Sequence, residues 1–254
     1  MYSRYIELLF YRAYAELMRD LKRAYLGILW WFIEPILYMA VFYVVFGIGL
    51  RKGGSDFVVY LLTGLIVWKW LDGTVKSSAN VISSSVGLMN QVYIPKMLLP
   101  GMIVVVNTYK LTTVIIIFLL CLVFLWGIPV TQYWQCLPLL LLLQLVLICG
   151  IAGIAAAIVP IVPDFKYVIE YGMTLAFFMS GIFFDIHDLT PEIQHWLMLN
   201  PMVVLIESYR DVLLYARWPD WPALLTVTYE AVTAFVIMLI LLVKLDRYYP
   251  RVVG

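Results

Sequence analysis

The segment WQCLPLLLLLQLVLICGIAGIAAAIVP, residues 134–160, decides the fold of this chain. It contains no charged side chain. A helix needs about 20 mainly apolar residues to cross a hydrocarbon core of about 30 Å, so this segment predicts a transmembrane helix. Gly150, Gly153 and Ala157 recur in it at helical spacing, and small residues in that arrangement let a second helix approach closely. We therefore expect tight packing against another helix of the same chain.

The rest of the chain follows the same pattern. Of its 254 residues, 64% are hydrophobic and only 13% are charged, whereas about a quarter of the residues in a soluble domain are charged. The excess is gathered into runs that predict six spans, at 31–50, 57–75, 102–126, 134–160, 167–184 and 221–245. We therefore expect an all-α integral membrane protein with a single transmembrane domain over 1–254, in which 29–250 form a six-span bundle.

The basic residues orient this bundle. If both ends of the chain are cytoplasmic, eleven Lys and Arg residues lie in cytoplasmic segments and four in outer segments, while Lys69 and Lys110 fall within spans. Cytoplasmic loops carry the excess of positive charge in membrane proteins. Both termini are therefore expected in the cytoplasm. The four outer basic residues are Arg51, Lys52, Arg210 and Arg217.

Residues 1–28 precede the first span and read as an amphipathic interfacial helix. Over 6–26, an apolar stripe and a charged stripe recur at three- and four-residue steps, the spacing of one helix face. Two interpretations stay open, a surface anchor and a docking element for a cytoplasmic partner. The apolar stripe is Ile6, Phe10, Ala13, Leu17, Leu21 and Ala24, and the charged stripe is Arg12, Glu16, Arg19 and Arg23.

The outer segment 186–218 is neither a simple loop nor a span. Thr190 precedes Pro191 and Glu192, and Asn200 precedes Pro201; a capping residue followed by proline predicts a helix start. Two helices are expected, over about 191–198 and 201–215. They are too short or too charged to cross the membrane, so we interpret them as outer gate helices that dip in from the outer face. The candidate gate residues are Asn200, Pro201, Glu207 and Arg210.

The sequence offers little catalytic chemistry. The pattern G-x-x-x-x-G-K-[ST] does not occur, so the chain does not bind and hydrolyse ATP by the P-loop route. Asp185, His187 and Asp188 lie close together in sequence, but one cluster in one loop is a weak indication of a metal site, and we predict none. Lys69 and Asp72 are three residues apart on one expected helix and are predicted to neutralise each other.

Aromatic residues are concentrated in three of the expected spans. Such stripes commonly pack against lipid or other helices. The alternative is a channel whose rings stack on the C–H faces of sugar rings, which needs no fixed register. Composition leaves both interpretations open. The candidate channel residues are Tyr38, Phe42, Tyr43, Phe46, Trp68, Phe177, Phe178, Phe183 and Phe184.

Four local motifs occur in order along the chain. They are LGILWWFIEP at 26–35, GLMNQVYIPKMLLPG at 87–101, PDFKYVIEYGMTLAFFMSGIFF at 163–184 and LMLNPMVVLIESYRDVLL at 197–214. Together they resemble the permease subunits of ABC-2-type polysaccharide exporters, which transport O-antigen, capsule and teichoic acid in bacteria. The chain has Asn90 and Gln91 where the family often has basic residues. It has Ser180-Gly181 where the family commonly has Ser-Pro, which predicts a softer kink.

The resemblance implies an export function for this chain. It implies a homodimer in the bacterial inner membrane, with two copies of a separate P-loop ATPase that hold ATP and Mg²⁺, and no cofactor in this chain. The substrate is then a lipid-linked glycan, and the first and fifth spans of both protomers enclose its path. The N-terminal helix and the cytoplasmic segment 86–97 are expected to contact the ATPase. The implied contact residues are Arg12, Arg19, Arg23, Gly87, Leu88, Asn90, Gln91, Val92, Tyr93, Pro95 and Lys96.

Three other functions stay open at this point. One is an ABC-2 permease for a drug or a lipid. Another is a membrane-embedded transferase that uses the outer Asp and His residues. The last is a structural scaffold in the membrane. None of them involves a nucleic acid.

Overall fold

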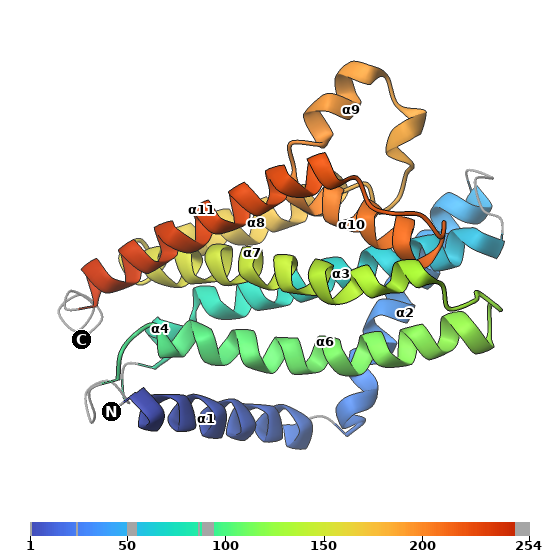
Figure 1. Cartoon of the computed structure of the whole chain (residues 1–254). Coiled ribbons are helices and arrows are strands. Elements are labelled where there is room, and N and C mark those ends of the chain that lie inside the picture. The colour runs from blue at the N-terminus through green and yellow to red at the C-terminus, as the bar shows by residue number, and fades with distance from the viewer. Residues whose placement is uncertain (1, 24, 50–54, 86, 88–93, 247–254) are drawn as a thin grey trace.

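The computed structural model describes residues 2–23, 25–49, 55–85, 87 and 94–246, and these contain helices and turns but no strand (Figure 1). Five helices in this part of the chain are long and apolar enough to cross a membrane, which confirms five of the expected spans. They are α2 (Trp30–Phe42) with its π-helical continuation η2 (Tyr43–Gly49), α3 (Ser55–Ala79), α6 (Leu98–Phe124), α7 (Leu137–Ile158) and α11 (Trp221–Leu245).

The expected fifth span is shorter than its apolar run. α8 covers Phe165–Phe178, 14 residues, or about 21 Å at the helical rise of 1.5 Å per residue. The Ser180 hydroxyl donates to the carbonyl of Phe177, and Gly181 has φ +69°, a conformation that side-chain-bearing residues avoid. The chain therefore turns after α8 instead of bending softly as predicted at Ser180-Gly181. The count of six spans stays a prediction.

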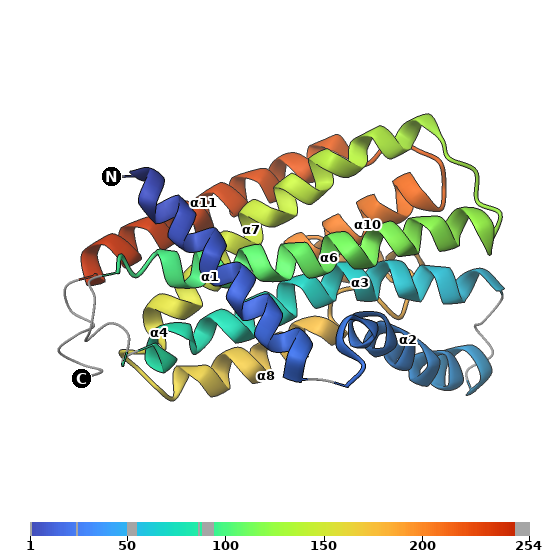
Figure 2. The same ribbon diagram turned by 90° about the horizontal axis from the view of Figure 1, so that it is seen from below.

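α7 and α11 form the closest helix pair in the bundle (Figures 1 and 2). A Cβ on Gly150 would lie 2.7 Å from the carbonyl carbon of Ala234, and a Cβ on Gly153 would collide with the side chain of Met238. Only glycine permits this backbone approach, as expected for small residues at a membrane helix interface. The predicted intramolecular role of Gly150 and Gly153 is confirmed.

α1 (Tyr2–Arg23) runs obliquely across α6 near the end of the bundle that holds α4 (Val81–Ser84), the start of α1 and the end of α11 (Figure 2). We call this the α4 end. Ala13 and Leu17 are buried in a cluster with Leu99 and Met102 of α6. Phe10 is 58% exposed, so this member of the predicted apolar stripe does not pack on the bundle, and its place at the membrane interface stays a prediction. The buried stripe of α1 is narrower than the sequence pattern because only one helix, α6, covers most of it.

The two expected outer helices are α9 (Pro191–Leu197) and α10 (Pro201–Leu213). The Asn200 side chain accepts a hydrogen bond from the Met202 N–H at 3.0 Å, and Pro201 occupies the first turn. The predicted start of α10 is therefore confirmed at its cap. α9 projects from the bundle (Figure 1), whereas every residue of α10 from Met202 to Leu213 is buried against α3, α7 and α11.

Candidate functional site

Seven of the nine candidate channel residues form one network of ring contacts between α2, α3 and the end of α8. Phe42 lies at its centre, with its ring centroid 4.3 Å from that of Phe183 and 5.9 Å from that of Phe177. Trp68 of α3 joins through Phe177 at 5.7 Å. Among the described residues, Tyr43 and Phe184 are not part of this network. The aromatic cluster, as we call it, is Tyr38, Phe42, Phe46, Trp68, Phe177, Phe178 and Phe183.

One face of this cluster is left open by the single chain. Tyr38 is 40% exposed and Phe178 is 52% exposed. In the α2 span, Gly27–Ile48, only Pro35 and Gly47 are buried within the protein. Rings from two helices therefore meet at a surface that this chain alone does not cover.

A lysine borders the cluster on the side of the α4 end. Lys69 Nζ lies 4.0 Å from the centroid of the Tyr38 ring and 2.6 Å from Oε1 of Glu34 on α2. Asp72 instead pairs with Lys76 at 2.7 Å, one turn along α3. The predicted Lys69–Asp72 pair is therefore wrong, because α2 supplies a carboxylate that the spacing within α3 does not reveal.

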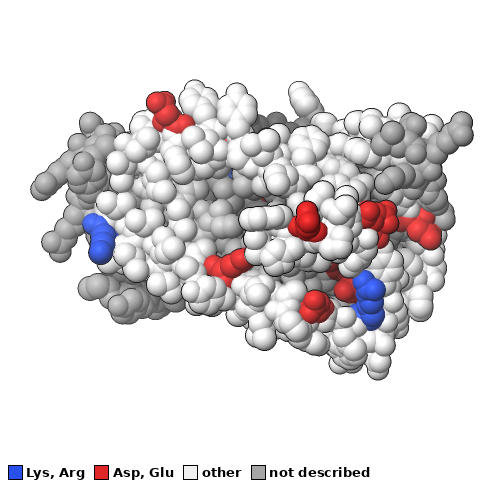
Figure 3. Space-filling view, turned by 90° about the horizontal axis from the view of Figure 1, so that it is seen from above, with Lys and Arg blue, Asp and Glu red and all other residues white. Residues whose placement is uncertain are grey.

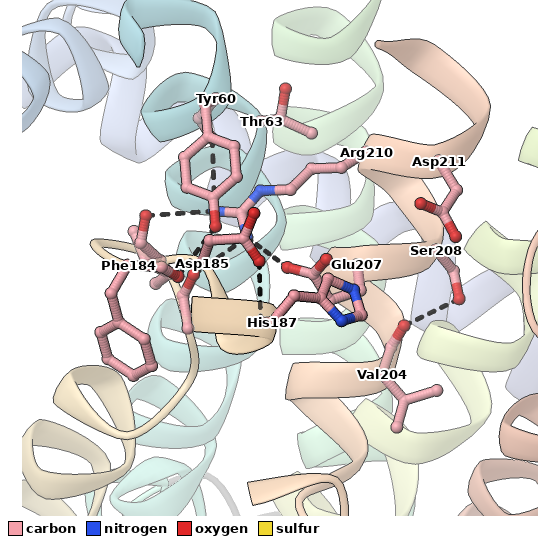
Figure 4. Close-up of polar contacts among 12 residues, drawn as sticks. Tyr60, Thr63, Phe184, Asp185, His187, Val204, Glu207, Ser208, Arg210 and Asp211 are labelled. Atoms are coloured by element: carbon pink, nitrogen blue, oxygen red, sulfur yellow. Dashed lines mark hydrogen bonds and ion pairs between the residues drawn. The ribbon is translucent and has the colours of Figure 1, made fainter. Parts of the chain in front are cut away.

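Arg210 of α10 is the most thoroughly enclosed charge among the described residues, with 0% exposure (Figure 4). Its Nη1 donates to Oε1 of Glu207 at 2.6 Å and to the carbonyl of Gly181 at 2.9 Å. Its Nη2 donates to the carbonyls of Ile182 at 3.1 Å and Tyr60 at 3.4 Å. The guanidinium thereby joins α10 to α3 and to the turn that follows α8.

Two residues of α3 complete this arginine site, and the sequence interpretation did not include them. The Tyr60 ring lies 3.3 Å from Cζ of Arg210, and its hydroxyl donates to the carbonyl of Phe184 at 2.8 Å. A Cβ on Gly64 would stand 3.2 Å from Nη2. Tyr60 and Gly64 are one helical turn apart, on one face of α3. An aromatic residue and a glycine at that spacing are the available sequence indication.

The structure groups the outer acids differently from the sequence. Ligand atoms of Asp185, His187 and Glu207 lie within 4.8 Å of one another, so Glu207 takes the place that the sequence cluster gave to Asp188. Glu207 already accepts from Arg210, and the Asp185 carboxylate accepts from the His187 N–H at 2.9 Å (Figure 4). Glu207 is thus held by an ion pair and Asp185 by a backbone hydrogen bond, contacts that need no metal, and the absence of a metal stays a prediction.

A second ion pair closes the end of α10. Arg217 Nη2 lies 2.7 Å from Oδ1 of Asp211. Burial raises the pKa of the Asp211 carboxyl, and the hydrogen bond from Arg217 opposes the rise. The same hydrogen bond raises the pKa of Arg217. This pair therefore fixes the turn that leads into α11.

The expected ATPase-contact residues gather at the α4 end where the structure describes them. A cavity of about 750 Å³ opens there between α1, α4 and α6, with Arg12, Arg19 and Gly87 on its walls. Lys96 is buried, and its backbone N–H donates to Asp246 after α11, so this residue attaches the segment to the bundle. Pro95 is described beside it. The side chain of Arg23 and residues Leu88, Asn90, Gln91, Val92 and Tyr93 lie outside the described residues.

Lys110 links this cavity to the middle of the bundle. It pairs with Asp20 of α1 at 2.7 Å and also lines a smaller cavity of about 290 Å³ beside Glu34 and Lys69. α1 is thus attached to α6 by an ion pair as well as by the contacts of Ala13 and Leu17.

Comparisons with known proteins agree on one family. A family model described as ABC-2 type transporter matches residues 7–214. The chain is 29% identical to the O-antigen export system permease protein RfbA of Myxococcus xanthus over 207 residues, covering 81% of this chain and 79% of the relative. It is 26% identical to the polysialic acid transport protein KpsM of Escherichia coli, covering 82% and 81%. It is also 26% identical to the capsule polysaccharide export inner-membrane protein CtrC of Neisseria meningitidis serogroup B, covering 77% and 76%.

Proposed function

The chain belongs to the ABC-2 type transporter family, and on that premise we propose that it is the permease subunit of a bacterial exporter of lipid-linked polysaccharide, such as O-antigen or capsule. Relatives named as O-antigen, polysialic acid and capsule exporters support this substrate class. The observation that carries the proposal is the aromatic cluster between α2, α3 and α8. Its rings offer apolar faces to the C–H groups of sugars and impose no hydrogen-bond register on a moving chain.

The working assembly that we propose is a homodimer with two copies of a separate ATPase, located in the inner membrane with both termini in the cytoplasm. The absence of a P-loop motif from the sequence supports a separate ATPase. The open face of the aromatic cluster supports the dimer, because a second copy would enclose the rings that one copy leaves exposed. ATP and Mg²⁺ belong to the ATPase in this scheme.

The proposed coupling runs from α1 and the 86–97 segment into the bundle. ATP binding closes the nucleotide domains and displaces these two elements. Ala13, Leu17 and the Asp20–Lys110 ion pair bind α1 to α6, so a force on α1 reaches α6 directly. Lys96 transmits force to the end of α11 through Asp246. The path then opens, or the glycan advances, while the membrane part stays folded.

The double variant Tyr38→Ala with Phe42→Ala tests the aromatic path. We expect export of the glycan to fall sharply while dimer assembly and ATP hydrolysis persist, because the two rings lie on α2 and away from the ATPase contacts. The measurement compares surface glycan with ATPase activity of the purified complex. Tyr229→Ala is the matched control, since Tyr229 lies on α11 and is 76% exposed. Unchanged export in the double variant would refute the proposed aromatic path.

Co-purification tests the partner. The proposal predicts a gene for a P-loop ATPase beside this one, and its product is expected to bind the chain when the two are co-expressed. Val92→Asp or Tyr93→Ala is expected to separate ATP hydrolysis from export. An ATPase that does not bind the wild-type chain refutes the ABC assignment, and normal coupling in both variants refutes the contact. An exported drug or lipid in place of a glycan would support the alternative permease function.

A further inference from the structure

A cavity of about 630 Å³ opens at the end of the bundle opposite the α4 end, which the distribution of basic residues places outside. It lies between the start of α3, the turn after α6, the 183–188 segment and the end of α10. Its volume is within the range of about 300–1,000 Å³ that is usual for small-molecule sites. We call it the outer cavity. Its lining includes Asp56, Phe57, Tyr60, Trp126, Asp185 and Asp188.

The aromatic lining of this cavity is held in place. The rings of Phe57 and Tyr60 lie nearly parallel, with centroids 6.2 Å apart and an angle of 14° between their planes. Tyr60 is anchored by its hydrogen bond to the Phe184 carbonyl and by the guanidinium of Arg210 (Figure 4). Trp126 contributes an aromatic side chain from another element. Rings fixed in this way lose little conformational entropy when a ligand stacks on them.

The polar lining of the cavity is acidic. Asp185 and Asp188 come from the segment that follows α8, and Asp56 from the start of α3, whereas no lysine or arginine is among the described residues that line it. Figure 3 shows several acidic side chains, with one basic side chain beside them, toward this end of the molecule. Carboxylates accept hydrogen bonds from hydroxyl and ammonium groups. They repel ligands that carry a carboxylate or a phosphate.

The outer cavity shares Phe183 with the aromatic cluster. Phe183 lines the cavity, and its ring also contacts Phe42 at 4.3 Å and Phe46 at 5.5 Å. Because the Phe183 ring is itself buried, with 3% exposure, it packs the two regions side by side, and the proposed glycan path runs from the cluster to the adjacent cavity. The Glu34 carboxylate beside the cluster is paired with Lys69, whereas the described lining of the cavity has carboxylates and no lysine or arginine. The cavity is therefore the part of this path that can distinguish sugars by their charge.

We infer that the outer cavity binds a sugar residue of the exported glycan, and that it accepts neutral and amino-bearing sugars but disfavours sugars that carry a carboxylate. The inference rests on the proposed export function. The aromatic rings stack on the apolar face of the sugar, and Asp185 and Asp188 accept hydrogen bonds from its hydroxyl or ammonium groups. The outer cavity thus sets a charge preference that the apolar cluster does not provide.

Binding of three trisaccharides to the full chain in lipid nanodiscs tests the inference. The probes are N-acetylglucosamine, glucosamine and galacturonic acid trisaccharides, which are neutral, cationic and anionic. Saturation-transfer NMR reports contact, and competition titrations give affinities. We expect the first two probes to bind and the galacturonic acid probe to bind at least about tenfold more weakly, a difference of about 1.4 kcal/mol.

Two conservative variants test whether the probes bind in the outer cavity. Phe57→Leu keeps apolar volume but removes a stacking face, and is expected to weaken both bound probes about fivefold. Asp188→Asn removes a charge from an exposed position and is expected to weaken the glucosamine probe about fivefold, with a smaller effect on the neutral one. Tyr229→Leu on α11 and Asp164→Asn before α8 are the controls, expected to bind as wild type does.

Three results would overturn the inference: no bound probe, equal or tighter binding of the anionic probe, or wild-type affinities in both cavity variants. The assay requires neither ATP nor the ATPase. An inactive transport complex therefore refutes the export function without altering the binding result, and absent sugar binding in an active exporter refutes the outer cavity alone.

Discussion

α2 is less buried within the protein than its apolar composition suggests, and α10 is more buried than its charged residues suggest. α2 with its flanking helical turns η1 (Gly27–Leu29) and η2 is an apolar span of 22 residues, yet only Pro35 and Gly47 in it are buried within the protein. α10 has 13 residues, including Glu207, Arg210 and Asp211, and is buried from Met202 to Leu213. The bundle therefore encloses the more polar of the two helices.

This difference follows from the bilayer as solvent. Lipid tails are as apolar as leucine, so hydrophobicity alone does not drive one apolar helix against another in a membrane. Charged side chains are costly in lipid and are found facing the interior of the bundle, paired with each other or with backbone carbonyls. Arg210 meets both conditions through Glu207 and three carbonyl groups.

Arg210→Met gives the largest expected effect. It leaves the Glu207 carboxylate and the carbonyls of Gly181 and Ile182 without their donor in a buried site. Removal of one partner of a buried ion pair costs about 3–5 kcal/mol. Thermal unfolding of the purified protein should show this loss. Backbone amides in the segment between α8 and α9 should also exchange hydrogen faster than in the wild type.

The double variant Arg210→Met with Glu207→Leu sharpens the interpretation. Since it removes the orphaned charge as well, we expect it to regain a large part of the stability lost in Arg210→Met. A double variant as unstable as the single one would show that Arg210 acts through its carbonyl contacts and not through the ion pair.

Gly64→Ala has the next largest expected effect on the α10 side of the comparison. The added Cβ would stand 3.2 Å from Arg210 Nη2 and from Ile182 Cγ1, and overpacking of this kind costs about 1–3 kcal/mol. Gly73→Ala on the same helix is the matched control, because its nearest neighbour is Oδ1 of Asn107 at 3.9 Å. Equal stability of the two variants would mean that the guanidinium has room to move.

Val41→Ala on α2 has the smallest expected effect. Val41 is 60% exposed, so its truncation should change the unfolding free energy of the monomeric subunit by less than about 0.5 kcal/mol. Thermal unfolding in detergent at a concentration that keeps the protein monomeric measures this. A loss of unfolding free energy as large as that in Gly64→Ala would contradict the view that α2 contributes little to the stability of the single chain.

The sequence predicted the long elements well, because apolar runs and cap residues act locally. The start of α10 followed from Asn200 and Pro201, and the positions of five spans from hydropathy. Many aromatic residues expected to share a path do touch, since Tyr38, Phe42 and Phe46 recur on one helix face. Their site role, like that of the gate and ATPase-contact residues, stays a prediction.

Ion pairs between side chains on different helices could not be predicted from the sequence. Nothing in the spacing of α3 indicates that Glu34 takes Lys69 away from Asp72, because that pair depends on how α2 crosses α3. Composition likewise made 167–184 a continuous span, whereas α8 ends at Phe178 and is followed by a turn in which Gly181 has a positive φ. Arg210 was assigned to an outer gate because its helix carries too much charge to cross the membrane, and that role stays a prediction. The sequence does not indicate that carbonyl groups of α3 and of the turn after α8 surround its guanidinium.

The glycine-mediated approach of α7 and α11 has a mechanical consequence. With Gly150 against the backbone of Ala234 and Gly153 against Met238, the two helices have no slack in which to slide or rotate. α7 and α11 therefore form a single rigid unit. In the proposed transport cycle, movement that starts at the α4 end would then be taken up by the sparsely packed α2, the short α8 and the α1–α6 pair.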